Sequence, residues 1–261
     1  MSADAPGGRV SIIALDGIPE IRAGDELAVL LGDALERTAG VLPLEQGDVL
    51  VVTQKIVSKA DGATVDLRTV EPRAEALEFG RRWDRDPRQV EVVLREARRV
   101  VRMGRGVLIT ETRHGFICAN GGVDASNIGP ASGDVVTLLP DDPDASARGI
   151  RDALRSRFGH DLAVVISDSF GRPWRWGIVD VALGVAGMKP LEDLRGTPDA
   201  DGRTMRATVR AVADEIASAA ELALGKTARR PAALVRGAGP VRGEGSIRPS
   251  ALIESNLDMF R

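Results

Sequence analysis

The order of the predicted helices and strands limits the fold more than any other feature of this chain. Apolar residues three and four apart predict two neighbouring helices at residues 71–82 and 86–102, and three strand-like runs follow them with only short breaks. A doubly wound parallel sheet needs strands and helices that alternate along the chain, which this order does not provide. The sequence therefore predicts an α+β fold.

The remaining elements are predicted from runs of β-branched and apolar residues between Gly, Pro or Asp, and from helical periodicity. Strands are expected at residues 10–14, 48–53, 107–110, 115–118, 135–139, 162–166 and 232–235. Further helices are expected at residues 25–37, 144–158 and 203–224. Gly-containing breaks near residues 103–106 and 184–190 predict two domains. The larger comprises residues 1–105 and 185–261, and the smaller residues 106–184.

Composition excludes several classes of protein. The chain has 261 residues, 43% of them hydrophobic, so it can bury a large core, and Cys118 has no second cysteine with which to form a disulfide. With 35 basic and 38 acidic residues, the formal charge of -3 lacks the basic field typical of nucleic-acid-binding proteins. Neither an apolar run of about 18 residues nor a secretory signal is present. We expect a soluble cytoplasmic protein that binds neither membranes nor nucleic acid.

The strongest functional signal lies at the end of the strand predicted at residues 162–166. Asp168 and Ser169 follow that strand and precede Arg172 and Arg175. A carboxylate and a hydroxyl offer hard oxygen ligands for a divalent cation, and guanidinium groups suit phosphate. This pattern indicates phosphate chemistry with a metal.

A second candidate lies after a pair of glycines. Asp124 and Asn127 are three residues apart, so both side chains can reach one metal or phosphate group, although the same residue types also form ordinary turns. Asp168 favours the functional interpretation, because acids gathered around Mg²⁺ or Mn²⁺ neutralise triphosphate charge. Lys55 and Lys59 are four residues apart after a predicted strand, where they either face a common anion or serve solubility alone.

Several residues and segments resemble functional motifs but are better interpreted as structural. The segment Leu224-Gly-Lys-Thr227 resembles the end of a Walker A loop, but Ala220 stands where that motif requires Gly. Gly225 is interpreted as a helix C-cap, with Lys226 beside the negative end of the helix dipole. Asp144 is interpreted as a helix N-cap and Cys118 as an inert buried thiol. Structural roles are the default for the two histidines, His114 and His160.

Six segments together resemble the coenzyme F420-0:γ-glutamyl ligase family. They are residues 17–21, 47–62, 122–127, 138–146, 168–175 and 213–217, among them Gly17-Ile-Pro-Glu-Ile21 and Asp168-Ser-Phe-Gly-Arg-Pro-Trp-Arg175. They occur in the family's order. The chain looks like the stand-alone ligase, without the nitroreductase-like C-terminal domain of the fused bacterial form.

The resemblance implies a GTP-dependent amide ligase of coenzyme F420 biosynthesis. Such an enzyme attaches L-glutamate to F420-0 through an acyl phosphate, releases GDP and phosphate, and adds further glutamates through γ-linkages. The family also implies a two-domain α+β fold, an intertwined homodimer, two Mg²⁺ or Mn²⁺ ions, and K⁺. Two alternatives stay open: a protein that binds GTP without ligase activity, and an enzyme that joins another amino acid to a related acid.

The resemblance also implies roles for individual residues. The implied GTP contacts are Ile18, Pro19, Glu20, Ile21, Gln54, Lys59 and Asn127. The implied metal ligands are Asp124, Asp168 and Ser169. Lys59 would offset charge that passes to GDP. Arg172 and Arg175 would hold the acyl phosphate or the precursor's phosphodiester, or else form structural ion pairs.

One departure leaves a metal ligand unassigned. Family members often carry Gln or Glu shortly before an Ala-Asp-Glu stretch, where this chain has Thr208-Val-Arg210. Trp174 and Trp176, beside the proposed metal site, are the candidates for stacking on the deazaflavin ring, or else belong to the core.

Overall fold

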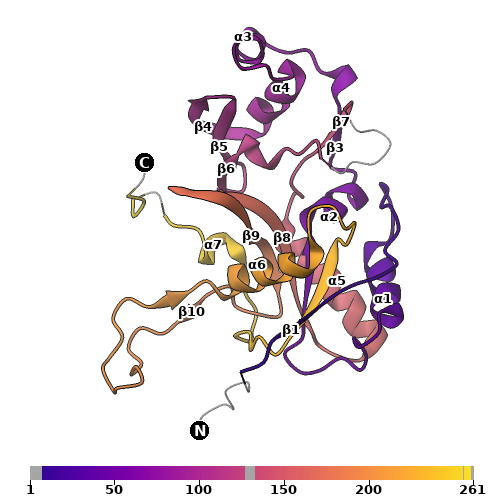
Figure 1. Ribbon diagram of the computed structural model, residues 1–261, viewed down its shortest axis with the longest axis vertical. Coiled ribbons are helices and arrows are strands. Elements are labelled where there is room, and N and C mark those ends of the chain that lie inside the picture. The colour runs from indigo at the N-terminus through magenta and orange to yellow at the C-terminus, as the bar shows by residue number, and fades with distance from the viewer. Residues whose placement is uncertain (1–7, 127–132, 255, 260–261) are drawn as a thin grey trace.

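The protein is built around one mixed β-sheet (Figure 1), seen in a computed structural model that describes residues 8–126, 133–254 and 256–259. The sheet has five strands in the order β1-β12-β2-β8-β9. They are β1 (Ser11–Ala14), β12 (Ala232–Arg236), β2 (Val49–Thr53), β8 (Ala163–Arg172) and β9 (Arg175–Ala186). β2 and β8 run parallel, whereas every other neighbouring pair in this sheet is antiparallel.

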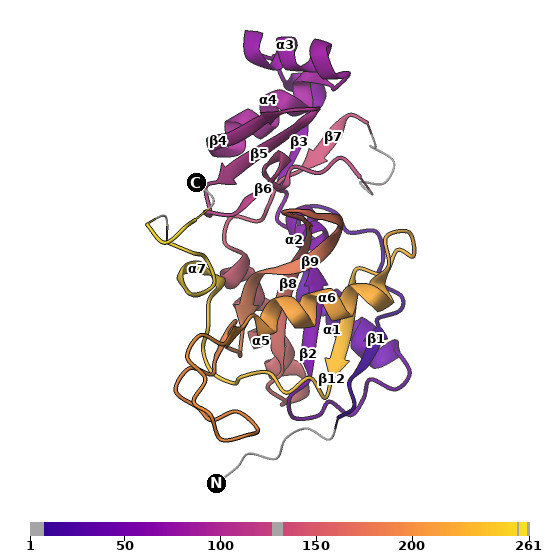
Figure 2. The same cartoon turned by 60° about the vertical axis from the view of Figure 1, so that its left-hand side comes forward.

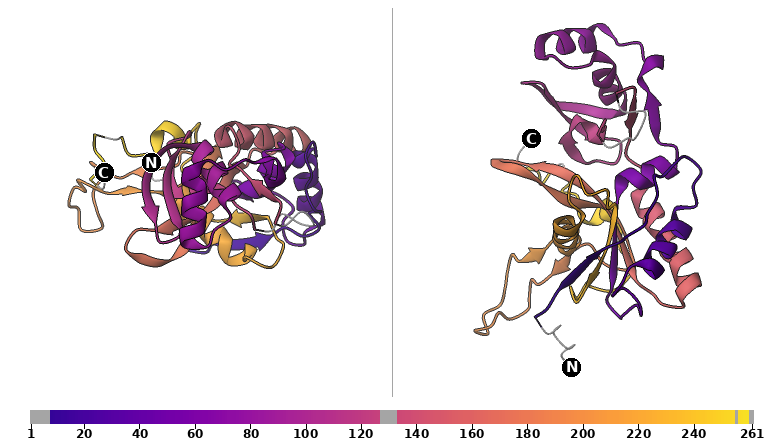
Figure 3. Two further views of the ribbon diagram at one scale, coloured as in Figure 1. Left: turned by 90° about the horizontal axis from the view of Figure 1, so that it is seen from above. Right: turned by 45° about the vertical axis from the view of Figure 1, so that its right-hand side comes forward.

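Helices cover both faces of this sheet. Because successive side chains of a strand point to opposite faces, Leu50 and Val52 of β2 enter one apolar cluster and Val49 and Val51 enter another. The first cluster is closed by α1 (Leu27–Arg37), α2 (Gln54–Ala60) and α5 (Pro143–Phe158), and the second by α6 (Val212–Leu224). Figure 3 (right) shows α6 on the opposite side of the sheet from α1 and α5.

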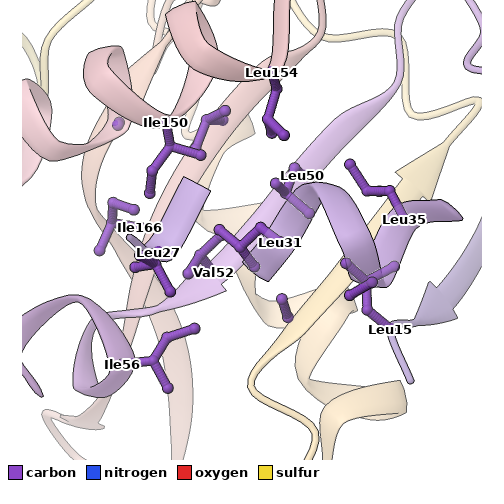
Figure 4. Packing of buried hydrophobic residues seen from close by; sticks show 14 of the residues in the cluster. Leu15, Leu27, Leu31, Leu35, Leu50, Val52, Ile56, Ile150, Leu154 and Ile166 are labelled. Carbon is purple, nitrogen blue, oxygen red and sulfur yellow. The ribbon is translucent and has the colours of Figure 1, made fainter. Parts of the chain in front are cut away.

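The first cluster is a dense layer of aliphatic side chains. Figure 4 shows Leu31 of α1 and Ile150 of α5 gathered with Leu50 of β2, and each of these three residues is at most 6% exposed. A strand buried on both faces must be apolar at every position, which explains the unbroken run Val49-Leu-Val-Val52.

A second group of elements lies above the large sheet (Figure 2). It contains α3 (Ala74–Trp83), α4 (Pro87–Glu96), and a sheet of β4 (Ala97–Gly104), β5 (Val107–Thr112) and β6 (Ile117–Ala119). β3 (Thr64–Asp66) pairs with β7 (Val135–Thr137) beside them. Short elements complete the described chain: η1 (Leu67–Thr69), η2 (Asn120–Gly122), β10 (Glu192–Asp193), β11 (Val209–Arg210) and α7 (Ile247–Ser250).

The structure confirms a fold of mixed helices and strands, and each of the predicted strands has a counterpart in it. Two helix predictions were too long. Residues 97–102 form β4 rather than the end of α4, because Val100 and its neighbours pair with β5 and Arg99 reaches Glu111 across the two strands at 2.9 Å. Residues 203–211 precede α6, and Val209 and Arg210 pair with β10.

Two of the elements that the prediction missed matter for the site. α2 follows β2 without a loop, and β9 returns antiparallel to β8 over residues for which no element was predicted. The large sheet also takes strands from both predicted domains, since β8 and β9 fall within residues 106–184 and β2 falls within residues 1–105. The predicted boundaries therefore do not follow the sheets, and the division into two domains stays a prediction. None of the described helices is long and apolar enough to cross a membrane.

Gly184 lies where β9 packs closely against the start of α5. A Cβ atom at this position would lie 2.3 Å from the backbone carbonyl of Pro143, at the start of α5. We expect Gly184→Ala to lower the free energy of unfolding by roughly 2 kcal/mol or more, because backbone must move. Gly149→Ala is the matched control, since a Cβ there meets nothing within 4 Å and alanine favours the helix by up to about 1 kcal/mol. Urea denaturation that ranks the two variants equally would contradict this account.

Candidate active site

The candidate site lies where the parallel pairing of β2 with β8 ends. Thr53 pairs with Ser167 in the last rung between these strands, so Gln54 and Asp168 follow side by side. Asp168 lies inside β8, which continues to Arg172 in its pairing with β9, and not at the end of the strand as the sequence predicted. In open sheets that contain parallel strands, ligands bind beyond the carboxyl ends of those strands. Asp124 is brought to this edge by its bridge to Thr137 at the end of β7, above α2 in Figure 1.

Asp124 forms the centre of a compact polar cluster. Its carboxylate accepts hydrogen bonds from the backbone N–H of Ser126 at 2.7 Å and from the Ser126 hydroxyl at 3.0 Å. Lys55 donates to Asp124 at 2.6 Å and to the Ser126 carbonyl at 2.7 Å. Burial opposes the charge of Asp124, but the hydrogen bonds from Lys55 and Ser126 and the charge of Lys55 together outweigh it and lower the pKa of this carboxyl. Asp124 thus forms the hydrogen bonds of an ordinary turn and also lies at the candidate site, so the two interpretations offered for it do not exclude each other.

Asp168 has a different environment. Burial is the main cause that raises the pKa of this carboxyl to about 7, and the charges of Asp124 and Asp180 add to it while the Ser169 N–H and the charge of Lys55 act against it. The structure therefore brings Asp168 and Asp124 within electrostatic reach of each other, as the sequence analysis expected. Among the described residues, no ion pair with Asp168 is formed. A carboxylate that repels its neighbours in this way provides a site for a cation.

Ser169 lies on the other face of β8. Its hydroxyl donates to Asp180 of β9 at 2.6 Å and accepts a short hydrogen bond from Lys226. Asp180 is 2% exposed and also accepts from the Ser167 hydroxyl at 3.2 Å. Sequence reasoning missed Asp180 altogether and assigned Lys226 only to the end of α6. Gly225 does cap that helix, as predicted, but Lys226 reaches from the cap to Ser169.

The two lysines of α2 contact different acids. Lys55 meets Asp124, whereas Lys59 meets Glu20 at 2.5 Å, so the structure does not direct both at one anion. Pro19 and Glu20 lie exposed beside α2, while Ile21 is buried in the first apolar cluster with Ile18 packed against it. The segment predicted to contact nucleotide therefore borders the site through Glu20. Asn127 lies outside the described residues.

Gln54 carries an unused polar atom at the same edge. Its carbonyl oxygen accepts from the Ser58 hydroxyl at 2.8 Å, but its amide nitrogen is buried and has no hydrogen-bond partner among the described residues. A buried donor without a partner is destabilising and rare, so such groups commonly await a ligand. This observation fits the ligand contact predicted for Gln54.

Arg172 and Arg175 are not gathered with the acids. They face each other near the tip of the β8–β9 hairpin, with Arg172 four residues beyond Asp168, about 13 Å along an extended strand. Arg172 donates to the Trp176 carbonyl at 2.6 Å, and within the described ranges neither arginine forms an ion pair. Trp174 and Trp176 are 82% and 97% exposed, so the interpretation of these rings as core was wrong.

The remaining structural interpretations can be compared with the structure directly. Burial and the charge of Asp168 raise the pKa of Cys118 to about 12, which confirms an inert thiol. The N-cap of α5 is Asp142, which accepts from the Ala145 N–H, and not Asp144 as predicted. Asp144 instead accepts from the Val185 and Ile247 N–H groups, and so ties α5 to β9 and α7.

The donor set suits a divalent metal that is shared with a ligand. Asp124 and Asp168 supply carboxylate oxygens, the ligands that Mg²⁺ and Mn²⁺ prefer. Over the residues that the structure describes, no three acid, His or Cys side chains converge to hold a metal by themselves. Mg²⁺ commonly binds through one or two carboxylates and completes its coordination with water and phosphate oxygens.

Comparison with known proteins agrees with this geometry. The family model described as F420-0:Gamma-glutamyl ligase matches residues 17–237, which include every site residue above. The chain belongs to the F420-0:gamma-glutamyl ligase family. It is 42% identical to the coenzyme F420:L-glutamate ligase of Methanothermobacter thermautotrophicus over 97% of this chain and 99% of that protein. Identity is 42% with the ligase of the same name from Methanopyrus kandleri, over 97% and 100% of the two chains, and 37% with that of Methanocaldococcus jannaschii, over 97% of each.

The raised pKa of Asp168 predicts a pH-dependent cost to stability in the metal-free ligase-family protein. Asp168 keeps its proton up to about pH 7 when folded but loses it near 3.8 when unfolded, so the stability it contributes falls as the pH rises between these values. Asp168→Asn removes this loss. From about pH 5 to about pH 8, the variant should gain roughly 2 to 3 kcal/mol relative to the parent protein. Urea denaturation in EDTA measures the difference, and parallel pH profiles would contradict it.

Proposed function

We propose that this protein is a GTP- and divalent-metal-dependent ligase that adds L-glutamate to coenzyme F420-0, and then further γ-linked glutamates. The observation that carries the proposal is that Asp124 and Asp168 lie within electrostatic reach of each other beyond the parallel pairing of β2 with β8, in a chain of this family. Two relatives that are both 42% identical and nearly the same length bear the corresponding name, which supports the same substrates.

Asp124 and Asp168 would hold a Mg²⁺ or Mn²⁺ ion against the triphosphate. When bound, the ion neutralises charge on the β- and γ-phosphate oxygens as the γ-phosphoryl group is transferred. Lys55 and Ser126 hold the Asp124 carboxylate in place. Among the described residues Asp168 has no ammonium partner, so a cation beside it would offset both its burial and its repulsion by Asp124 and Asp180.

The nucleotide is needed because a carboxylate does not react with an amine directly. The carboxylate oxygen of F420-0 attacks the γ-phosphorus, the bond from phosphorus to the GDP oxygen breaks, and an acyl phosphate forms. The glutamate amine then attacks the acyl carbon, loses a proton, and displaces inorganic phosphate. Positioning and electrostatic stabilisation are the protein's main contributions to phosphoryl transfer. Lys59, which is almost buried beside Glu20, would offset the charge that passes to GDP.

Gln54 and the segment from Ile18 to Ile21 would complete the nucleotide site. The orphaned amide nitrogen of Gln54 supports a ligand acceptor at this edge. Glu20 lies half-exposed beside Lys59, which places a second hydrogen-bonding group on the same border. Arg172 and Arg175, with their guanidinium groups outside any ion pair among the described residues, would reach a phosphate of the extended F420-0 substrate or of a second subunit's site.

The protein would work as a homodimer. Trp174, Trp176 and Ile178 are 82%, 97% and 54% exposed at the end of the β8–β9 hairpin, which projects from the large sheet in Figure 1. Exposed aromatic side chains on a projecting element are typical of protein interfaces.

Loss of the Asp168 carboxylate tests the proposed chemistry. Asp168→Asn should lower GTP-dependent glutamylation of F420-0 by about two to three orders of magnitude or more, the scale seen when one group that stabilises transition-state charge is removed. Asp193→Asn is the matched control, because Asp193 is exposed on a hairpin and, among the described residues, pairs with Arg195 alone. The assay weighs the product by mass spectrometry after incubation with GTP, Mn²⁺, F420-0 and glutamate. Near-normal turnover by the Asp168 variant would exclude the metal role, and no gain in mass with the parent protein would exclude the ligase.

The homodimer has its own test. We expect Trp176→Ser to weaken self-association by roughly tenfold or more, because large aromatic side chains dominate interface energetics. Leu222→Ser on the outer face of α6 is the control, since Leu222 is 85% exposed but lies away from the hairpin. Sedimentation equilibrium measures both, and an unchanged dimer in the Trp176 variant would contradict the proposed interface.

A further inference from the structure

Lys226 places a positive charge on the face of β8 that carries Ser169, which we call the second face of the site. Its ammonium group contacts the Ser169 hydroxyl, and lies 3.3 Å from Asp180 and 2.9 Å from Glu221. These groups come from β8, β9 and the end of α6. They stand directly across β8 from the cluster of Asp124 and Asp168, because Asp168 and Ser169 are consecutive residues of one strand.

The Ser169 hydroxyl is already committed on this face. It has one proton, which it donates to Asp180 at 2.6 Å, and it accepts from Lys226 through a lone pair. A metal ion on the same oxygen would sit next to the Lys226 ammonium, and two neighbouring positive charges repel strongly in a partly buried site.

Asp180 also has its counter-charge supplied by the chain. The carboxylate is 2% exposed and receives the hydroxyls of Ser167 and Ser169 together with the ammonium of Lys226. Its own backbone carbonyl accepts from the Ser218 hydroxyl of α6 at 2.6 Å, which holds β9 against that helix. A buried acid of this kind requires a cation, and the sequence provides it covalently.

We infer that the Lys226 ammonium takes the place of a second divalent ion at Ser169 and Asp180, so that the protein binds a single divalent ion at Asp124 and Asp168. The inference rests on the proposed function, because it concerns how many divalent ions serve the GTP site. It departs from the expectation of two divalent ions, and it removes the Ser169 hydroxyl from the set of metal ligands.

The charge on Lys226 is stable under ordinary conditions. Burial lowers the tendency of this amine to ionise, but the hydrogen bond to Glu221 and the charge of Asp180 outweigh it and raise the pKa of Lys226. A lysine cannot dissociate from its site as K⁺ or Mg²⁺ can. The second face of the site therefore keeps one positive charge whatever the ionic composition of the solution.

Counting bound Mn²⁺ tests this arrangement without an activity assay. Mn²⁺ is titrated into the protein in the presence of GDP, and the free ion is measured by electron paramagnetic resonance. We expect one tightly bound Mn²⁺ per chain in the parent protein and two in Lys226→Gln, where an amide oxygen replaces the ammonium. Lys226→Met is the matched control that removes the charge without offering a ligand. Melting temperatures establish that each variant is folded.

The outcomes separate this inference from the proposed function. Two Mn²⁺ ions in the parent protein, or one ion in both the parent and Lys226→Gln, would overturn the role of Lys226 while leaving the ligase intact. No bound Mn²⁺ in the parent would overturn the proposed metal site as well. Ser169→Ala provides a second measurement that does not depend on the Lys226 variants. It should leave the single Mn²⁺ bound, and loss of that ion would return the Ser169 hydroxyl to the metal.

Discussion

The parallel pairing of β2 with β8 is the interaction on which the rest of the structure depends. These two strands are central in the large sheet and buried on both faces, with α1, α2 and α5 on one side and α6 on the other. Only parallel strands bring two carboxyl ends to the same edge, and that edge is where Gln54 and Asp168 emerge. Every other part of the site, including Asp124 above it and Lys226 beside it, is positioned against this pair.

The acidic side chains near the end of the parallel pairing of β2 with β8 do not all have a basic partner. Asp124 has Lys55, Glu20 has Lys59, and Asp180 has Lys226 as ammonium partners. Asp168 lies within electrostatic reach of two of these acids and has no ammonium of its own among the described residues, and burial above all raises its pKa to about 7. The chain thus supplies the counter-charge on one face of β8, and in the proposed function a cation supplies it on the other.

Local sequence patterns predicted the elements that local forces decide. The apolar runs of β2 and β8, the periodicity of α1 and α5, and the Gly225 cap all follow from neighbouring residues. The predictions went wrong where distant pairing decides the conformation. Residues 97–102 have helical spacing, yet Arg99 pairs across strands with Glu111 and the segment becomes β4. β9 was missed because its strand character comes from its pairing with β8.

By itself the sequence determined the family, the acid and hydroxyl that follow the apolar run of β8, and the Asp124 turn, because these depend on residue types in a fixed order along the chain. Only the tertiary structure decided which charges meet. Asp180 lies 46 residues from Lys226 and 11 from Ser169, and no local periodicity links them. The alternation of side chains along β8 then sends Asp168 and Ser169 to opposite faces, so two adjacent residues that read as one metal-binding pair belong to two separate clusters.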